Sequence, residues 1–280
     1  MSAQAPRREA VVPARRSEAR LVPARRRGRW ARVEPVVIGA ASVVVALAVW
    51  QWVALARLVP ELFLPGPLDI AQALAAYATS RDFGIDMATS AQELAVGYGL
   101  AIFVGLPVGL LMGWYRRLHY VLDPFISFMY STPRIALLPL LIIWLGIGIW
   151  SKVAVVFLGA FFPIAINTLT GVRSLDAALV RAARSFGASD PQIFRTLALP
   201  GSVPFILTGL RLGVGHALVG VVVGELVAAQ HGVGLVMAEA GATFQTSKVF
   251  AALIIVSVSG VILQVTLQRL EARFDAWRPR

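Results

Sequence analysis

The sequence contains no cysteine, only three histidines and few acidic residues. Lys and Arg number 26 against 15 Asp and Glu, and charged residues make up 15% of the 280 residues. The absence of cysteine excludes disulfides, thiol catalysis and cysteine-rich metal sites. The histidines, His119, His216 and His231, are far apart, and none lies in a metal-ligand spacing or beside a plausible nucleophile. No catalytic constellation is therefore recognised.

A phosphate-binding loop of the form GxxxxGK(S/T) is also absent from the sequence. We therefore expect the chain neither to bind nor to hydrolyse ATP by itself, and we expect no cofactor in it. Any energy that the chain uses must come from a partner or from an ion gradient.

Long apolar runs are abundant. Hydrophobic residues make up 58% of the sequence and the mean hydropathy is +0.73, well beyond an ordinary soluble domain. The composition predicts an all-α integral membrane protein with six transmembrane helices. The predicted spans are roughly Val36–Ala56, Ala88–Gly113, Val121–Ile147, Val153–Val172, Val203–Ala228 and Val249–Leu270.

Residues 1–35 form a basic tail that contains ten arginines against three glutamates, with alanine and proline between them. We expect a disordered cytoplasmic tail near anionic lipid, followed by a transmembrane domain over residues 36–280. The net charge of +11 also fits nucleic-acid binding. No aromatic or glycine-rich pattern accompanies the arginines, so no nucleic-acid partner is expected. The apolar run near Val36 lacks a small-residue cleavage site, which argues against a cleaved signal peptide.

Basic residues are concentrated in alternate connections of the six spans. Outside the tail they cluster after the second span, after the fourth span and at the C-terminus, whereas the other connections together carry more acidic than basic residues. The positive-inside rule therefore predicts that both termini and the connection after the fourth span are cytoplasmic.

The connection after the fourth span, residues 174–200, is the most informative segment. It is interpreted as two short helices joined by a glycine turn. Ser174 is predicted to cap the first helix, and Gly187 to end it in the left-handed conformation. Asp190 is predicted to cap the second helix, which Pro200 closes. The apolar face predicted for the first helix consists of Leu175, Leu179, Ala182, Ala183 and Phe186. A hairpin of this kind at a membrane surface is suited to being bound by another protein.

The third span contains Pro124, Pro133 and Pro139, with Arg134 beside the second of them. Proline removes a backbone donor and clashes with the preceding turn, so this span is predicted to be kinked or broken. Backbone groups freed at that depth must be satisfied by protein or by cavity water. The sequence leaves open whether the break is structural or belongs to a solute pathway.

Small residues recur every four positions in the second and fifth spans, a spacing that lets helix backbones approach closely. We therefore expect these two spans to be core helices of the bundle. The stripes are Gly97, Ala101, Gly105, Gly109 and Gly113 in one span, and Gly209, Gly213 and Ala217, followed by Gly220 and Gly224, in the other.

Ionisable residues inside the spans are functional candidates, because a charge in hydrocarbon needs a partner or water. The candidates for the pathway or a gate are Arg134, Arg211 and Glu225, and Glu93 is placed near the outer end of the second span. Arg211 and Glu225 lie on one helix, roughly 21 Å apart at 1.5 Å per residue, so they need different partners. Snorkelling or a carbonyl contact is favoured for Arg211 over a solute contact. Glu225 fits a structural contact and a gate equally well, whereas Arg134 would suit an anionic solute.

Together, the hairpin, its flanking spans and the small-residue stripes resemble the permease subunits of type I ABC importers, the binding-protein-dependent inner-membrane components. The signature of that family is Glu-Ala-Ala, three residues, Gly, and a spacer ending in Leu-Pro. The matching residues here are Arg181, Ala182, Ala183, Gly187, Leu199 and Pro200. Arg181 replaces the usual glutamate, a departure that bears on a salt bridge to the ATPase and not on the helix-turn-helix shape.

A closer likeness, over about residues 60–275, is to the branch that imports aliphatic sulfonates, taurine and nitrate. The segments that carry it are Gly105–Gly113, Leu122–Pro124, Ser131–Pro139, Trp144–Gly148, Phe161–Leu169 and Gly209–Leu212. The resemblance implies a small anion of this kind as the solute. The same branch also contains importers of pyrimidine precursors and other small solutes.

The resemblance also implies partners in a bacterial inner membrane. Two permease chains, expected to be identical, pair around a central pathway, and an extracytoplasmic solute-binding protein delivers the solute. A dimeric cytoplasmic ABC ATPase, which binds ATP and magnesium, receives one hairpin from each permease. Closure of the ATPase would pull the hairpins together and swing the spans to an outward-open state.

A self-sufficient ion-coupled transporter or channel is the competing hypothesis. Such a protein is expected to carry acidic residues deep in its spans and inverted repeats. The sequence has few such acids and no clear repeat, and this hypothesis gives no reason for the hairpin. An intramembrane enzyme would need a nucleophile with an adjacent base, which the sequence does not provide.

Overall fold

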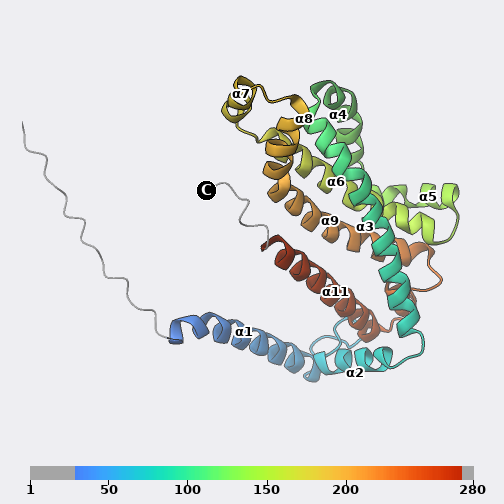
Figure 1. Cartoon of the computed structure of the whole chain (residues 1–280). Coiled ribbons are helices and arrows are strands. Elements are labelled where there is room, and N and C mark those ends of the chain that lie inside the picture. The colour runs from blue at the N-terminus through green and yellow to red at the C-terminus, as the bar shows by residue number, and fades with distance from the viewer. Residues whose placement is uncertain (1–28, 273–280) are drawn as a thin grey trace, which may run out of the picture. The chain divides into compact units, whose positions relative to one another are not determined.

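The computed structural model describes residues 29–272, which are almost entirely helical and contain no strand (Figure 1). This confirms the predicted all-α class. The α-helices are α1 (Arg29–Leu55), α2 (Pro67–Ala78), α3 (Phe83–Trp114), α4 (Arg116–Ser131), α5 (Leu138–Leu145), α6 (Ile149–Arg173), α7 (Ala177–Ser185), α8 (Asp190–Ile193), α9 (Leu199–Ala228), α10 (Val233–Ala242) and α11 (Thr246–Ala272). A 3-10 turn, η1 (Arg134–Leu137), precedes α5, and a π-helical segment, η2 (Phe194–Ala198), joins α8 to α9.

The chain divides into two units, each described by itself. The first ends at Ala48 and, within the described residues, consists of the first part of α1. The second begins at Val49 and holds the end of α1 and all the other helices. Most of the predicted tail lies outside the described residues, as do the terminal arginines Arg273, Arg278 and Arg280.

Residues 29–272 contain five helices long and apolar enough to span a membrane, or six, as predicted, when one bent helix pair is taken as a span. The single-helix spans are Val36–Leu55, Phe83–Trp114, Ile149–Arg173, Asp190–Ala228 and Thr246–Arg269, and the bent pair is Arg116–Ser131 with Arg134–Leu145. Two short helices, α2 and α10, lie between spans and were not predicted.

The third span is broken, as its prolines predicted. α4 ends at Ser131, and the chain resumes at Arg134 after a bend of 91°. Thr132 between them is extended, with ψ 133°, which is the conformation favoured before a proline. The break places Arg134 at the start of η1, where backbone groups are not all paired within a regular helix.

The core consists of α3, α6 and α9, which pack side by side with α6 in the middle. Glycines of the two predicted stripes face α6. A Cβ built at Gly109 would lie 2.5 Å from the carbonyl oxygen of Ala165, and one at Gly220 would lie 3.1 Å from the Cα of Val156. The expectation that the second and fifth spans are core helices is thus confirmed, and α6 is the helix on which both stripes pack.

The predicted hairpin is present, but the prediction of Ser174 as the cap of its first helix is wrong. α7 begins at Ala177 and its cap is Asp176, whose carboxylate accepts from the amide of Ala178 at 2.7 Å. Ser174 instead ends α6. Gly187, with φ +80°, ends α7 as predicted, and the amides of Gly187 and Ala188 bond to carbonyls of the last turn, the pattern of a Schellman motif.

The second helix of the hairpin also differs from the prediction. Ser189, not Asp190, lies at the N-cap, with Gln192 completing a capping box. Pro200 does not close the helix, because the helical span runs unbroken from Asp190 to Ala228. The π-helical segment just before Pro200 accounts for this, since its bonds already depart from the regular ladder that a proline would interrupt.

Candidate functional sites

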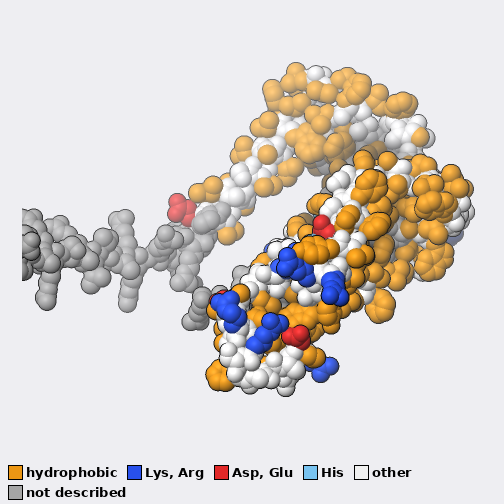
Figure 2. Space-filling view, turned by 90° about the horizontal axis from the view of Figure 1, so that it is seen from above, with side chains coloured by type: hydrophobic (Ala, Val, Ile, Leu, Met, Phe, Trp, Pro, Cys, Tyr) orange, Lys and Arg blue, Asp and Glu red, His pale blue; other side chains and the backbone are white. Residues whose placement is uncertain are grey.

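The hairpin exposes apolar side chains near the start of the long helical span Asp190–Ala228. Phe186 is 92% exposed and Leu179 is 55% exposed, and the side chain of Arg181 is also exposed. Figure 2 shows basic side chains gathered at this end among hydrophobic ones. The predicted coupling residues Ala182 and Ala183 lie on α7, while Leu199 and Pro200 lie in the first turn of α9.

The base of the hairpin is fixed to the bundle by ring and polar contacts. Trp114 at the end of α3 meets the ring of Phe194 edge-on, with centroids 5.3 Å apart. Arg173 at the end of α6 lies 3.1 Å from Nε2 of His119 on α4. The hairpin therefore projects from a fixed base.

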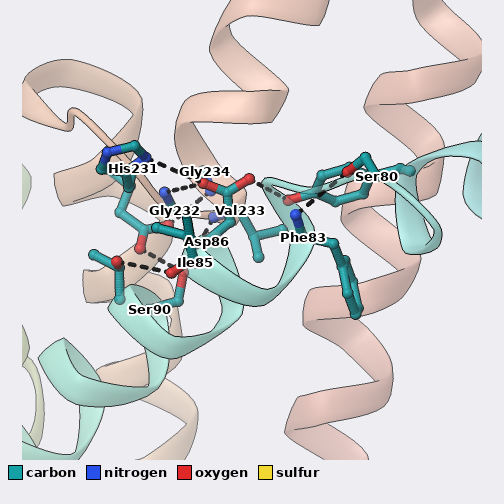
Figure 3. Close-up of polar contacts among 12 residues, drawn as sticks. Ser80, Phe83, Ile85, Asp86, Ser90, His231, Gly232, Val233 and Gly234 are labelled. Carbon is teal, nitrogen blue, oxygen red and sulfur yellow. Dashed lines mark hydrogen bonds and ion pairs between the residues drawn. The ribbon is translucent and has the colours of Figure 1, made fainter.

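Three polar side chains meet at the other end of the same long helix. Glu225, only 1% exposed, accepts from the hydroxyl of Ser90 at 2.5 Å and from the amide of Gly234 at 2.7 Å. Asp86, 3% exposed, accepts from the amide of Gly232 at 2.9 Å. Ser90 in turn accepts from the amide of Val233 at 3.1 Å (Figure 3). We call Asp86, Ser90 and Glu225 the α10 clasp.

The clasp satisfies the first amides of α10, which have no partner within their own helix. The carboxylates also lie at the positive end of that helix, where negative charge is stabilised. Two glycines allow this close approach: a Cβ at Gly232 would lie 2.3 Å from a carboxylate oxygen of Glu225, and one at Gly234 would lie 2.6 Å from its Cβ. Gly232 also has φ +132°, a conformation that side-chain-bearing residues rarely adopt.

The second carboxylate oxygen of Asp86 accepts from the hydroxyl of Tyr77 on α2 at 2.8 Å. Burial, and secondarily this bond to a carboxylate, raise the pKa of Tyr77 well above its usual range. The phenol therefore stays protonated and remains a donor to Asp86. His231 lies beside the same carboxylate, with Nδ1 3.9 Å from Asp86.

A buried ion pair lies close to the clasp. Glu93 on α3 and Lys152 on α6 are paired, and both side chains are almost fully buried. Lys152 also lies against α9, because a Cβ at Gly224 would be 3.1 Å from its Cγ. Asp86, Ser90 and Glu93 follow one another at helical spacing, so one face of α3 is polar over two turns.

Arg134 compensates for a defect in α6. Pro163 has no amide hydrogen, so the carbonyl of Gly159, four residues earlier, lacks its helical donor. Arg134 Nη1 donates to that carbonyl at 3.2 Å. The guanidinium also lies over the rings of Tyr130 and Phe162, at 5.4 and 5.7 Å from their centroids.

Arg211 is paired with Glu271 near the end of α11. The sequence interpretation, snorkelling or a carbonyl contact, is therefore replaced by an ion pair that ties α9 to α11. The prediction that Arg211 and Glu225 have different partners is confirmed. The sequence interpretation missed Glu271, Lys152, Asp86 and Ser90 as partners, although the polar spacing on α3 was a usable signal.

Comparison with known proteins gives the family of the chain. Residues 105–276 match the model of the binding-protein-dependent transport system inner membrane component. The chain belongs to this family. It is 35% identical over 255 residues to the taurine transport system permease protein TauC of Escherichia coli, covering 89% of this chain and 92% of that protein. It is 34% identical to SsuC of Bacillus subtilis, a permease protein named for aliphatic sulfonate transport, with 95% of each chain covered.

A solved structure of the methionine ABC transporter MetNI, in inward-facing conformations, shares the fold. Its chain matches with a TM-score of 0.59 and 20% identity, over 68% of this chain and 94% of that one. The protein is therefore a multi-pass membrane permease of the ABC importer class and not an enzyme, and the ATPase of such systems is a separate subunit. The family implies an ATPase, a solute-binding protein and a membrane as partners.

Proposed function

We propose that this permease carries a small anion of the sulfonate or taurine type through a pathway between two copies of the chain. The observation that carries the proposal is the near full-length similarity to two permeases named for such solutes. Arg134 supports it. Within residues 29–272 no carboxylate pairs with this guanidinium, whose contacts are one carbonyl and two aromatic rings.

The solute is tested by competition. Liposomes containing the permease, its ATPase and its binding protein are given labelled taurine with an excess of an alkanesulfonate, nitrate or an uncharged pyrimidine. We expect the alkanesulfonate to compete and the pyrimidine not to compete. Competition by the neutral pyrimidine alone would overturn the anion proposal.

The hairpin is proposed as the coupling element. The exposed apolar side chains of the hairpin would enter a groove of the ATPase, where burial of Phe186 and Leu179 stabilises the contact. Arg181 is exposed on the same helix and would contribute its charge to the rim of that contact. Ala182, Ala183 and Gly187 supply the narrow shape, and Leu199 and Pro200 continue it into α9.

The proposed location is the bacterial inner membrane, with both termini and the hairpin cytoplasmic. Residues 1–35 would form the cytoplasmic tail, and residues 36–280 the permease domain. Because the chain has no cysteine, single thiols report sidedness cleanly. We expect a membrane-impermeant maleimide outside the cell to label Ser80→Cys and not Ser185→Cys, both of which are exposed positions. The reverse labelling would contradict the topology.

A further inference from the structure

The α10 clasp is not explained by solute chemistry or by the hairpin. α10 packs mainly on α9 and α11 and has few contacts with α3. The amides of Gly232 and Val233 nevertheless bond to Asp86 and Ser90 of α3. These two polar bonds therefore tie α3 to the end of the loop that joins α9 to α10 and to the first residue of α10.

The loop has room to move. A cavity of about 560 Å³ touches Tyr77, Asp86 and the loop residue His231, and one of about 450 Å³ touches the clasp residues Ser90 and Glu225. The core between α3, α6 and α9 is different, because there the glycines approach neighbouring helices closely. Free volume at the loop and beside the clasp side chains leaves space for the loop to separate from α3 without repacking the core.

One helical span joins the clasp to the hairpin. Residues 190–228 are helical throughout, a length of roughly 58 Å at 1.5 Å per residue. The hairpin lies at the start of this span, and Glu225 lies in its last turn. The other two clasp residues, Asp86 and Ser90, belong to α3. Displacement of the hairpin along this axis therefore moves Glu225 relative to its serine partner.

We infer that the α10 clasp is the latch of the outer gate, closed in this structure and opened from the hairpin through α9. The inference rests on the proposed function, because it requires a motor on the hairpin and the topology proposed above. When the ATPase pulls the hairpin, α9 moves the carboxylate of Glu225 away from Ser90 and Gly234, and the loop separates from α3. Asp86, Ser90 and Glu225 are positioning residues: they hold the gate and do not touch the solute.

State-dependent cross-linking tests the latch. The absence of cysteine makes Ser90→Cys with Val233→Cys a clean pair, since the Ser90 hydroxyl accepts from the Val233 amide at 3.1 Å and both residues line the same cavity. The full complex in liposomes is treated with a short thiol-to-thiol reagent, without nucleotide and after trapping with ATP and vanadate. We expect the yield to fall by about fivefold or more on trapping, and the cross-link to stop uptake until it is cleaved.

A matched pair in the core is the control. A Cβ at Gly105 would lie 3.4 Å from the Cβ of Ile164, close to the separation in a disulfide. Cross-linking of Gly105→Cys with Ile164→Cys should be the same in both states. An unchanged yield at the clasp pair, in a complex that still takes up solute with ATP, would overturn the latch. Failure of the unmodified complex to transport with ATP would instead overturn the proposed function.

The Glu225→Gln variant distinguishes a latch from a purely structural role, because only a latch predicts a rise in ATPase activity without binding protein. The amide keeps the shape of the side chain but replaces one of the two acceptor oxygens by a donor. Loss of a contact made only in the closed state shifts the population to the ATP-bound state, so ATPase activity without binding protein should rise by about three- to tenfold. Glu225→Gln lowering ATPase activity, uptake and the amount of assembled complex together would contradict the latch.

Discussion

Arg134 donates to a carbonyl that Pro163 leaves without a helical donor. This gives the arginine a structural task that is separable from any contact with a solute. In Pro163→Ala the missing amide hydrogen is restored, so Gly159 no longer needs the guanidinium. The two tasks therefore respond differently to the same pair of substitutions.

We predict that Arg134→Gln destabilises the purified permease by about 1–3 kcal/mol and by much less in the Pro163→Ala background. Thermal unfolding of the four proteins in detergent gives the coupling energy. If Arg134 also contacts the solute, uptake falls in both backgrounds. Equal losses of stability in the two backgrounds would contradict the structural task.

The Glu93 and Lys152 pair supports a second prediction at this scale. Lys152→Met leaves the Glu93 carboxylate buried without its partner, which costs about 3–5 kcal/mol. Adding Glu93→Leu removes the uncompensated charge and should recover most of that loss. Thermal unfolding in detergent measures both variants. A double variant no more stable than Lys152→Met would show that the pair does not act as a unit.

The sequence could show which residues are polar inside apolar helices, but not their partners. Asp86 and Gly232 are 146 positions apart, and only the packing of α3 beside α9 and α10 brings them together. Glu225 is recognisable in the sequence as a charged residue inside an apolar helix. Its bonds to Ser90 and Gly234 depend on the packing of other helices and cannot be predicted from the sequence. The prediction for Arg211, snorkelling or a carbonyl contact, overlooks its partner Glu271, which lies on another helix.

At the scale of elements, the turn between α7 and α8 depends on one residue. Gly187 has φ +80°, and no atom lies within 4 Å of a Cβ built there. Substitution is therefore limited by backbone conformation and not by space, which favours Asn over Val.

We predict that Gly187→Val inserts into the membrane but abolishes ATP-driven uptake, because the hairpin no longer closes. Gly187→Asn should keep at least part of the uptake, because asparagine tolerates the left-handed conformation. Uptake by the two variants in liposomes, normalised to the inserted permease, makes the comparison. Normal uptake by Gly187→Val would exclude a coupling role for this turn.

The elements show where local signals suffice. Gly187 ended α7 as expected, and the prolines of the third span predicted its break. Pro200 misled the interpretation, because the π-helical segment before it lets the helix continue through Pro200 into α9. The short helices α2 and α10 were missed because they are too short to stand out as spans. The stripes predicted core helices, but the identity of the middle helix, α6, depends on three-dimensional packing.

At the scale of the whole molecule, the described residues leave many large apolar side chains exposed, among them Phe103, Ile143 and Trp144. Lipid and a second permease chain would cover such a surface. The second unit has a hairpin at one end of its longest helical span and the α10 clasp at the other. This arrangement suits a protein that is moved from one side of a membrane to open the other.

The most direct measurement of this account is solute uptake into liposomes that contain the permease with and without its ATPase. The account predicts uptake only when ATPase, ATP and solute-loaded binding protein are all present, and none under an ion gradient alone. Uptake by the purified permease alone, driven by an ion gradient, would contradict it and favour a self-sufficient transporter.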